Sequence, residues 1–216
     1  MGIPADGRVA LMARLIFTED NHEYRVDGVV YPSVSEIMRF VSRDVYDDTN
    51  QYAVDRAAER GAAVHKACEA LDKYGRIECD EDIASYVTAY VKFLRERKPE
   101  WAEIEKSLHH PGLLYAGTLD RTGVMDGETV IVDIKTSYAV NKRLATIQLA
   151  AYAMLTTHVP DKLYILHLKP DETYKLHEIP FNPEPFTSCL NLHNHMESTR
   201  CDRYKLRIKL EKEKSA

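Results

Sequence analysis

The sequence predicts an α/β protein in which helices cover a central mixed β-sheet. The length of 216 residues suits one domain, and 44% apolar with 29% charged residues is typical of a globular protein. After a short hairpin, the local patterns indicate helices, then three strands, another helix and further strands. This order favours a mixed sheet with helices on its faces.

The N-terminal lead-in, residues 1–50, is predicted to hold a hairpin followed by a helix. Short apolar segments on either side of polar turns indicate the hairpin over residues 15–31. Ser33, with Glu36 three residues later, has the pattern of a capping box. This pattern predicts a helix that starts here and runs to about Ser42.

Residues 51–180 are predicted to form the core, and residues 181–216 a C-terminal helix with a charged tail. Apolar residues at helical spacing predict helices over residues 50–73, 81–97, 142–157 and 183 to about 200. Apolar runs between turn residues predict strands over residues 101–109, 114–120, 129–136, 162–169 and 173–179. Gly61, inside the first long helix, costs about 1 kcal/mol relative to Ala, which predicts a break or a close contact there.

The composition excludes several classes of protein. The net charge of −5 argues against a generally basic nucleic-acid binder. It is compatible with a nuclease, because acidic metal ligands lower the net charge and bound metals restore positive potential. No segment has the length of a membrane span and the N-terminus is a poor signal peptide, so we expect a cytoplasmic protein, in the host cytoplasm if the source is viral. The cysteines form no C-x-x-C pair, so we expect buried free thiols at Cys68, Cys79, Cys189 and Cys201.

The predicted function depends mostly on three polar side chains of a predicted hairpin. Asp120 lies shortly after Gly117 in one strand, and Asp133 and Lys135 alternate with apolar residues in the next. Because side chains alternate along a strand, Asp133 and Lys135 are expected on the same face. The Asp126-Gly127 turn between the strands would bring Asp120 near Asp133.

Two carboxylates and an amine brought together in this way can hold a divalent metal and activate a water molecule. Hard oxygen ligands suit Mg²⁺ or Mn²⁺, which lower the pKa of a bound water and neutralise charge on a phosphate. Lys135 could orient the water or stabilise the transition state. This chemistry describes the hydrolysis of a phosphodiester.

Two helices add polar pairs at i and i+4, a spacing that puts both members on one face of a helix. The upstream helix carries His65 and Glu69, and the helix after the hairpin carries Gln148 and Tyr152. Gln148 can hydrogen-bond a phosphate or a metal-bound water, and Tyr152 can hydrogen-bond or stack. Together with the hairpin, these pairs predict a functional site much more specifically than a D-x-K pattern does alone.

The ordered set of motifs resembles the RecB-like branch of the PD-(D/E)xK nuclease superfamily, which includes phage-type and mitochondrial-type single-domain exonucleases. The resemblance spans roughly residues 31–168, and the matching segments are YPSVSEIM, RGAAVHKACEAL, AGTLDRTG, VDIKTS and QLAAYA. It implies a restriction-endonuclease-like core with the order αβββαβ and an N-terminal helical extension. Residues 1–216 would then be a single nuclease domain, with residues 51–180 as its catalytic core.

The resemblance also implies roles for individual residues. Lys135 would be the catalytic lysine, acting with Asp120 and Asp133. The implied metal ligands are Asp120, Asp133, the Mn²⁺-favouring His65 and the backbone carbonyl of Ile134. Gln148 and Tyr152 would contact the substrate strand, and Glu105 is a further acidic candidate. Some relatives hold an iron–sulfur cluster with three C-terminal cysteines, but only Cys189 and Cys201 lie late in this chain, so no cluster is expected.

Three further residues are placed to contact a DNA strand. Lys142 and Arg143 begin the helix of Gln148 and could bind the phosphate backbone, and Tyr138 could stack on a base. We therefore predict a Mg²⁺- or Mn²⁺-dependent deoxyribonuclease, most consistent with an exonuclease on single-stranded DNA or DNA ends. An endonuclease of the same fold and a non-cleaving DNA-binding accessory protein are the alternatives. DNA is the expected partner, with recombination or replication proteins as candidates and no membrane.

Overall fold

The computed structural model describes residues 13–46 and 51–214, and within them the central feature is a five-stranded sheet in the order β4-β5-β6-β7-β8. The strands are β4 (Glu100–His110), β5 (Tyr115–Met125), β6 (Glu128–Lys135), β7 (Lys162–Leu168) and β8 (Tyr174–Ile179). Strands β6 and β7 are parallel, and the other neighbours are antiparallel. The predicted mixed sheet is therefore confirmed.

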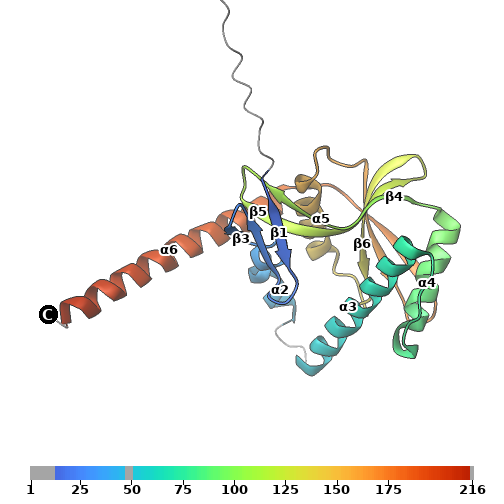
Figure 1. Cartoon of the computed structure of the whole chain (residues 1–216), viewed down its shortest axis with the longest axis horizontal. Coiled ribbons are helices and arrows are strands. Elements are labelled where there is room, and N and C mark those ends of the chain that lie inside the picture. Colours follow the sequence, from blue (N-terminus) through green and yellow to red (C-terminus); the bar gives the residue numbers. More distant parts are fainter. Residues whose placement is uncertain (1–12, 47–50, 215–216) are drawn as a thin grey trace, which may run out of the picture.

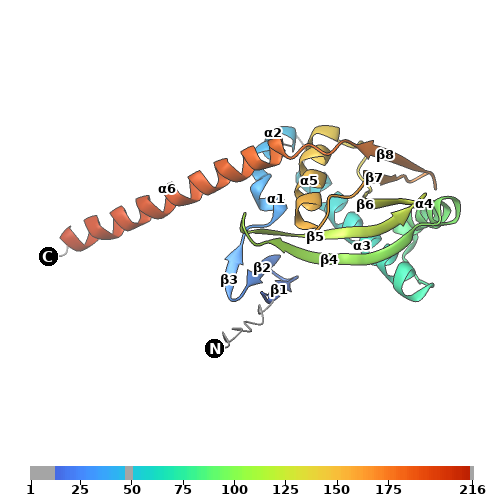
Figure 2. The ribbon, with the colours of Figure 1, turned by 90° about the horizontal axis from the view of Figure 1, so that it is seen from above.

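Helices cover both faces of this sheet (Figures 1 and 2). One face is covered by α3 (Gln51–Tyr74) and α4 (Glu81–Arg97). The other face is covered by α1 (Val34–Ile37), α5 (Lys142–Leu155) and the first turns of α6 (Glu184–Lys214). Helix, three strands, helix and strand follow one another from α4 to β7, so the predicted αβββαβ order is also confirmed.

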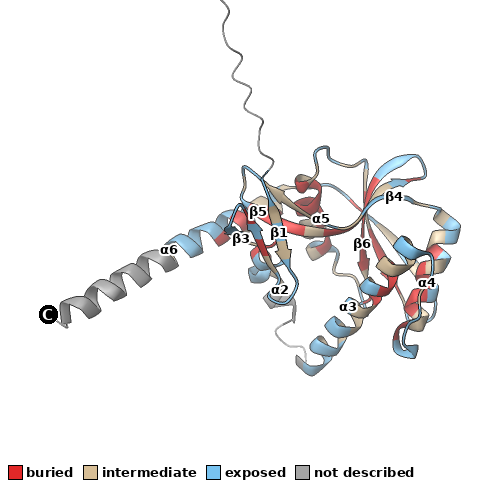
Figure 3. Ribbon diagram, viewed as in Figure 1, coloured by how far each residue is buried: buried red, intermediate tan, exposed pale blue. Residues whose placement is uncertain are grey.

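The sheet separates two hydrophobic cores, which is why β6 is apolar on both faces. Val130, Val132 and Ile134 pack with α3 and α4, whereas Ile131 packs with α1 and α5. Buried residues follow the central strands and the helix faces turned toward them (Figure 3). The alternation puts Asp133 and Lys135 on the Ile131 face, at the C-terminal end of the strand.

A small antiparallel sheet precedes the core, formed by β1 (Leu15–Thr18), β2 (Glu23–Val26) and β3 (Val29–Tyr31). The predicted hairpin and both of its turns are therefore confirmed. This sheet is attached to β5, because the Ala116 amide donates to the Pro32 carbonyl at 3.0 Å. The attachment carries the β1–β2 turn alongside the strand of Asp120.

Several predicted boundaries differ from the structure. The helix expected over residues 33–42 is interrupted at Met38, with α2 (Arg39–Tyr46) following α1, although Ser33 caps the first turn by accepting from the Glu36 amide at 3.0 Å. Strand β5 continues past Asp120 because its second half pairs with both β4 and β6. Helix α3 passes through Gly61 without a break, and α6 extends beyond residue 200.

Two further expectations concern membranes and thiols. None of the described helices combines the length and hydropathy that a membrane span requires. Cys68 is buried, Cys189 is half-buried and Cys79 is exposed, so the expectation of buried thiols is wrong for Cys79. The side chain of Cys201 lies outside the described residues.

Candidate active site

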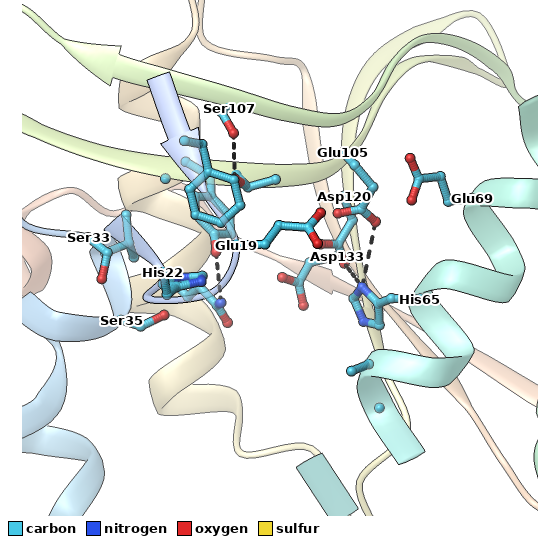
Figure 4. Close-up of a pocket in the computed structure, with 18 of the residues that line it drawn as sticks. Glu19, His22, Ser33, Ser35, His65, Glu69, Glu105, Ser107, Asp120 and Asp133 are labelled. Atoms are coloured by element: carbon cyan, nitrogen blue, oxygen red, sulfur yellow. Dashed lines mark hydrogen bonds and ion pairs between the residues drawn. The ribbon is translucent and has the colours of Figure 1, made fainter. Parts of the chain in front are cut away.

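A pocket of about 530 Å³ opens between the small N-terminal sheet, α3 and strands β4 to β6 (Figure 4). The predicted site residues that line it are His65, Asp120, Asp133, Lys135, Gln148 and Tyr152. Tyr138, Lys142 and Arg143 are not among the lining residues. The fold thus collects residues from two helices and two strands, separated by up to 87 positions between His65 and Tyr152, around one cavity.

Three side chains from three different elements form a set that could hold a metal. The ligand atoms of His65 on α3, Glu105 on β4 and Asp120 on β5 all lie within 4.8 Å of one another. Nδ1 of His65 is 3.6 Å from Oδ2 of Asp120 and 3.7 Å from Oε1 of Glu105. Carboxylate oxygens with one imidazole nitrogen are a donor set that Mn²⁺ and Mg²⁺ accept.

The second ring nitrogen of His65 fixes the orientation of this ligand. Nε2 lies 2.9 Å from the backbone carbonyl of Ile134, and because a carbonyl can only accept, Nε2 carries a hydrogen. Nδ1 is therefore the atom that faces the carboxylates. A ring N–H held by a carbonyl is the usual support of a metal-binding histidine. In this structure the Ile134 carbonyl orients His65.

The electrostatics of His65 favour a positive charge at this point. Burial lowers the pKa of the imidazole, but the Asp120 and Glu105 carboxylates outweigh it and raise the pKa to about 9. The same negative potential that retains a proton on the ring also attracts a cation. A metal ion at His65 would therefore take the place of the imidazole proton, which the neighbouring carboxylates stabilise.

Asp133 and Lys135 form a close pair beside the candidate metal ligands. Nζ of Lys135 is 2.6 Å from Oδ2 of Asp133, whose side chain is only 2% exposed. Burial raises the pKa of Asp133 to about 6, while Lys135 lowers it and Asp120 raises it. Asp120 is held in place because its Oδ2 accepts from the Ile134 amide at 2.7 Å. The hairpin therefore brings Asp120, Asp133 and Lys135 together, as the Asp126-Gly127 turn predicts.

A buried ionic network lies behind Glu105 and was not predicted from the sequence. The Arg121 side chain is completely buried, with Nε 2.6 Å from Asp72 Oδ2 on α3 and one terminal nitrogen 3.0 Å from Glu105 Oε1. The Tyr90 hydroxyl also donates to Asp72 at 2.7 Å. Arg121 directly follows Asp120, so the two side chains point to opposite faces of β5. Strand β5 thus supplies the site carboxylate of Asp120 and also Arg121, which holds the neighbouring carboxylate of Glu105.

Glu105 itself has a backbone conformation that is uncommon for its residue type. Its φ of 49° lies in the left-handed region, although it is in the middle of β4. Ile104 pairs with Arg121 and Lys106 pairs with Leu119, so Glu105 lies across from Asp120. Such strain persists where surrounding contacts enforce it, and here the Arg121 contact holds the carboxylate beside His65.

Gln148 and Tyr152 lie on the α5 side of the pocket and contact each other. Nε2 of Gln148 donates to the Tyr152 hydroxyl at 3.1 Å. Burial, with Asp133 and Asp120, raises the pKa of Tyr152 well above its usual value, so the phenol stays protonated. Gly117 allows this ring to approach β5 closely, because a β-carbon on Gly117 would lie 2.9 Å from a Tyr152 ring carbon.

The other three predicted substrate contacts lie outside the pocket. Tyr138 is fully exposed in the loop after β6, and Lys142 and Arg143 are exposed in the first turn of α5. Partial burial lowers the pKa of His177, and the positive charges of Lys175 and Lys142 lower it further.

The β1–β2 hairpin contributes pocket residues that sequence reasoning missed. Phe17, Glu19, His22 and Tyr24 all line the cavity. Figure 4 shows the Glu19 carboxylate turned toward Asp120 and Asp133. No local pattern could have revealed this placement, because it depends on the pairing of the N-terminal sheet with β5.

Comparisons with known proteins give only distant similarities. No protein-family model matches the chain, and no curated protein matches it. Among solved structures, an alkaline exonuclease (LHK-Exo) from Laribacter hongkongensis is 13% identical over 82% of this chain and 94% of its own, with a TM-score of 0.46. The same exonuclease in complex with dAMP gives a TM-score of 0.43 at 13% identity over the same shares of both chains. SSO0001 is 16% identical over 74% of this chain and 72% of its own, with a TM-score of 0.39.

Proposed function

We propose that this chain is a metal-dependent nuclease that hydrolyses phosphodiester bonds in DNA. The observation that carries the proposal is the convergence of His65, Glu105 and Asp120 within 4.8 Å, beside the 2.6 Å pair of Lys135 and Asp133. A lysine next to two buried carboxylates and a histidine is an unusual charge arrangement for a purely structural site. It suits a reaction in which a cation, a water molecule and a phosphate meet.

The residues present fit Mg²⁺ or Mn²⁺. His65 Nδ1, Glu105 and Asp120 would hold the ion, with Asp133 as the adjacent carboxylate, and the imidazole favours Mn²⁺ over Mg²⁺. When bound, the ion would polarise the phosphate and lower the pKa of a water ligand. The Ile134 carbonyl, also predicted as a ligand, contacts Nε2 rather than Nδ1 of His65, so its proposed role beside this ion is to orient the imidazole.

The other residues of the pocket have distinct proposed tasks. Lys135 orients the attacking water and stabilises the negative charge that develops on the phosphate. The Gln148 amide and the Tyr152 phenol, which remains protonated, offer donors to the oxygens of the scissile strand. Asp133 holds Lys135 in place at the pocket through their ion pair.

We further propose that the enzyme belongs to the RecB-like branch of the PD-(D/E)xK nucleases and acts as an exonuclease on single strands or DNA ends. The order of the motifs along the chain supports the branch, and the small size of the pocket supports a substrate strand rather than an intact duplex. An endonuclease of the same fold and a non-cleaving DNA-binding subunit are the competing functions. The intact Lys135 and its paired carboxylate favour a cleaving enzyme over the latter.

A cleavage assay separates these functions. Single- and double-stranded DNA labelled at either end, and a closed single-stranded circle, are incubated with the protein in Mn²⁺, Mg²⁺ or EDTA. We expect the linear DNA to be degraded with either metal, the circle to stay intact, and EDTA to abolish cleavage. Cutting of the circle would establish an endonuclease. DNA binding without cleavage in any metal would establish an accessory protein.

The basic surface at the start of α5 is proposed to bind the DNA backbone leading to the pocket. Replacing Lys142 and Arg143 together with Gln is expected to lower the slope of log affinity against log salt by about 1.4, because each phosphate contact on a single strand contributes about 0.7. Fluorescence anisotropy with a labelled single strand over a salt series measures this slope. The matched control replaces Lys92 and Arg95 with Gln, two exposed cations on α4. Equal slopes in both variants would contradict the proposed DNA path.

A further inference from the structure

The pocket wall opposite α3 is an aromatic cluster on the β1–β2 hairpin. The rings of Phe17 and Tyr24 stack with their centroids 4.6 Å apart and an angle of 28° between their planes. The His22 ring meets both edge-on, at 5.2 Å from Phe17 and 5.6 Å from Tyr24. All three line the same cavity as Asp120 and Lys135, so aromatic surface and candidate catalytic groups face one space.

This wall is fixed to the strand that carries Asp120. The Tyr24 side chain is buried, and its hydroxyl hydrogen-bonds Thr118 Oγ1 at 2.8 Å. Thr118 in turn hydrogen-bonds Ser107 Oγ on β4 at 2.8 Å. Thr118 is two residues before Asp120, so both point to the same face of β5. The position of the rings relative to the proposed metal ligands is thereby set by a short chain of direct contacts.

The chemistry of the wall suits a nucleobase and disfavours a phosphate. Phe17 is half-buried and His22 is exposed, so ring surface remains available to a ligand. The one carboxylate that the hairpin adds to the pocket, that of Glu19, is turned toward the site (Figure 4) and repels phosphate oxygens. It accepts hydrogen bonds from base or sugar donors. Lys66 and Lys135, the lysines among the described lining residues, come from α3 and β6.

The size of the cavity suits a single nucleotide. A volume of about 530 Å³ lies within the range of roughly 300–1,000 Å³ that encloses a single small ligand. One nucleotide beside the scissile phosphate fits such a space. Base stacking on aromatic side chains is tolerant of sequence, because every base presents a π face.

We propose that the β1–β2 hairpin is the binding subsite for the terminal nucleoside of the substrate strand. The base stacks on Phe17 and His22, and Glu19 accepts a hydrogen bond from the base or the sugar. This inference rests on the proposed nuclease function, which it deepens by naming the group bound next to the cleaved bond. It also provides a physical reason for action at strand ends.

The test uses single-stranded DNA carrying 2-aminopurine, a base whose fluorescence is quenched by stacking, either at one end or in the interior. Binding is measured in Ca²⁺, a hard cation for oxygen ligands, and electrophoresis verifies that the strand stays intact during the titration. We expect the wild-type protein to quench the probe at one end more than the interior probe. The Phe17→Leu variant should lose this quenching and bind about 5- to 150-fold more weakly, the equivalent of one stacked base. Phe17→Trp should restore both.

Controls separate the subsite from folding and from the proposed activity. Phe40→Leu makes the same change at an exposed ring outside the pocket and should leave quenching unchanged. His22→Ala alters an exposed side chain, so reduced quenching in this variant supports the subsite even where Phe17→Leu fails to fold. Equal quenching in wild type, Phe17→Leu and His22→Ala would overturn the inference. Terminal quenching without cleavage in Mn²⁺ or Mg²⁺ would overturn the nuclease function and leave the subsite standing.

Discussion

Replacing Asp133 with Asn is expected to abolish metal-dependent DNA cleavage, with a fall in rate of at least about 10³-fold. The substitution keeps the shape of the side chain but removes the charge next to the proposed cation, and such charge stabilisation contributes several kcal/mol to a transition state. It also removes the negative charge that pairs with Lys135 at 2.6 Å. Initial rates on an end-labelled single strand in Mn²⁺ measure the effect.

The same substitution is expected to leave the fold intact. Burial raises the pKa of Asp133 to about 6, so its ionised form at neutral pH destabilises the folded metal-free protein relative to the unfolded chain. A neutral amide removes that cost, and the midpoint of urea unfolding in EDTA should stay equal or rise. Asp171→Asn, at an exposed turn before β8, is the matched control and should cleave like the wild type. Full activity in Asp133→Asn would contradict the proposed site.

Replacing Arg121 with Met is expected to lower the free energy of unfolding by about 3–5 kcal/mol, the largest effect on stability that we predict. Arg121 is completely buried and pairs with both Asp72 and Glu105. Methionine fills part of the volume but leaves the Asp72 carboxylate, whose side chain is 3% exposed, without its cation. Urea unfolding followed by circular dichroism measures the loss.

A second substitution distinguishes the charge effect from a packing effect. Asp72→Leu in the Arg121→Met background removes the orphaned carboxylate, so a large part of the lost stability should return. Activity should not return with it, because Glu105 still lacks the contact that holds its strained backbone beside His65. If the double variant is no more stable than Arg121→Met, the ionic network is not the cause of the loss.

The order of elements could be predicted because it depends on local patterns. The Asp126-Gly127 turn has φ values of 55° and 83°, which suit Asp and Gly and bend the hairpin where the sequence predicts it. Ser33 caps α1 through a hydrogen bond three residues away. The extension of β5 through Arg121 to Met125 was missed because this segment lacks a continuous apolar run. It is a strand because β4 and β6 both pair with it.

The candidate site likewise has one part that follows from local sequence spacing and another that depends on tertiary packing. Asp133 and Lys135 lie two residues apart on one strand, so their proximity follows from the period of a β-strand. His65 and Gln148 could be selected by motif spacing, but their convergence depends on how α3 and α5 pack on the sheet. Tyr138, Lys142 and Arg143 are near these residues in sequence, yet the turn into α5 directs them outside the pocket.

The amino-acid sequence therefore specifies the helices, the strands, the turns and the charged groups of the central hairpin, since each depends on residues a few positions apart. Contacts between distant segments determine the rest. Glu105 lies beside His65 because β4 places it across from Asp120, Arg121 supports it because α3 supplies Asp72, and Phe17 enters the cavity because the N-terminal sheet docks on β5. These contacts arise from packing and pairing across long stretches of chain, and no local periodicity encodes them.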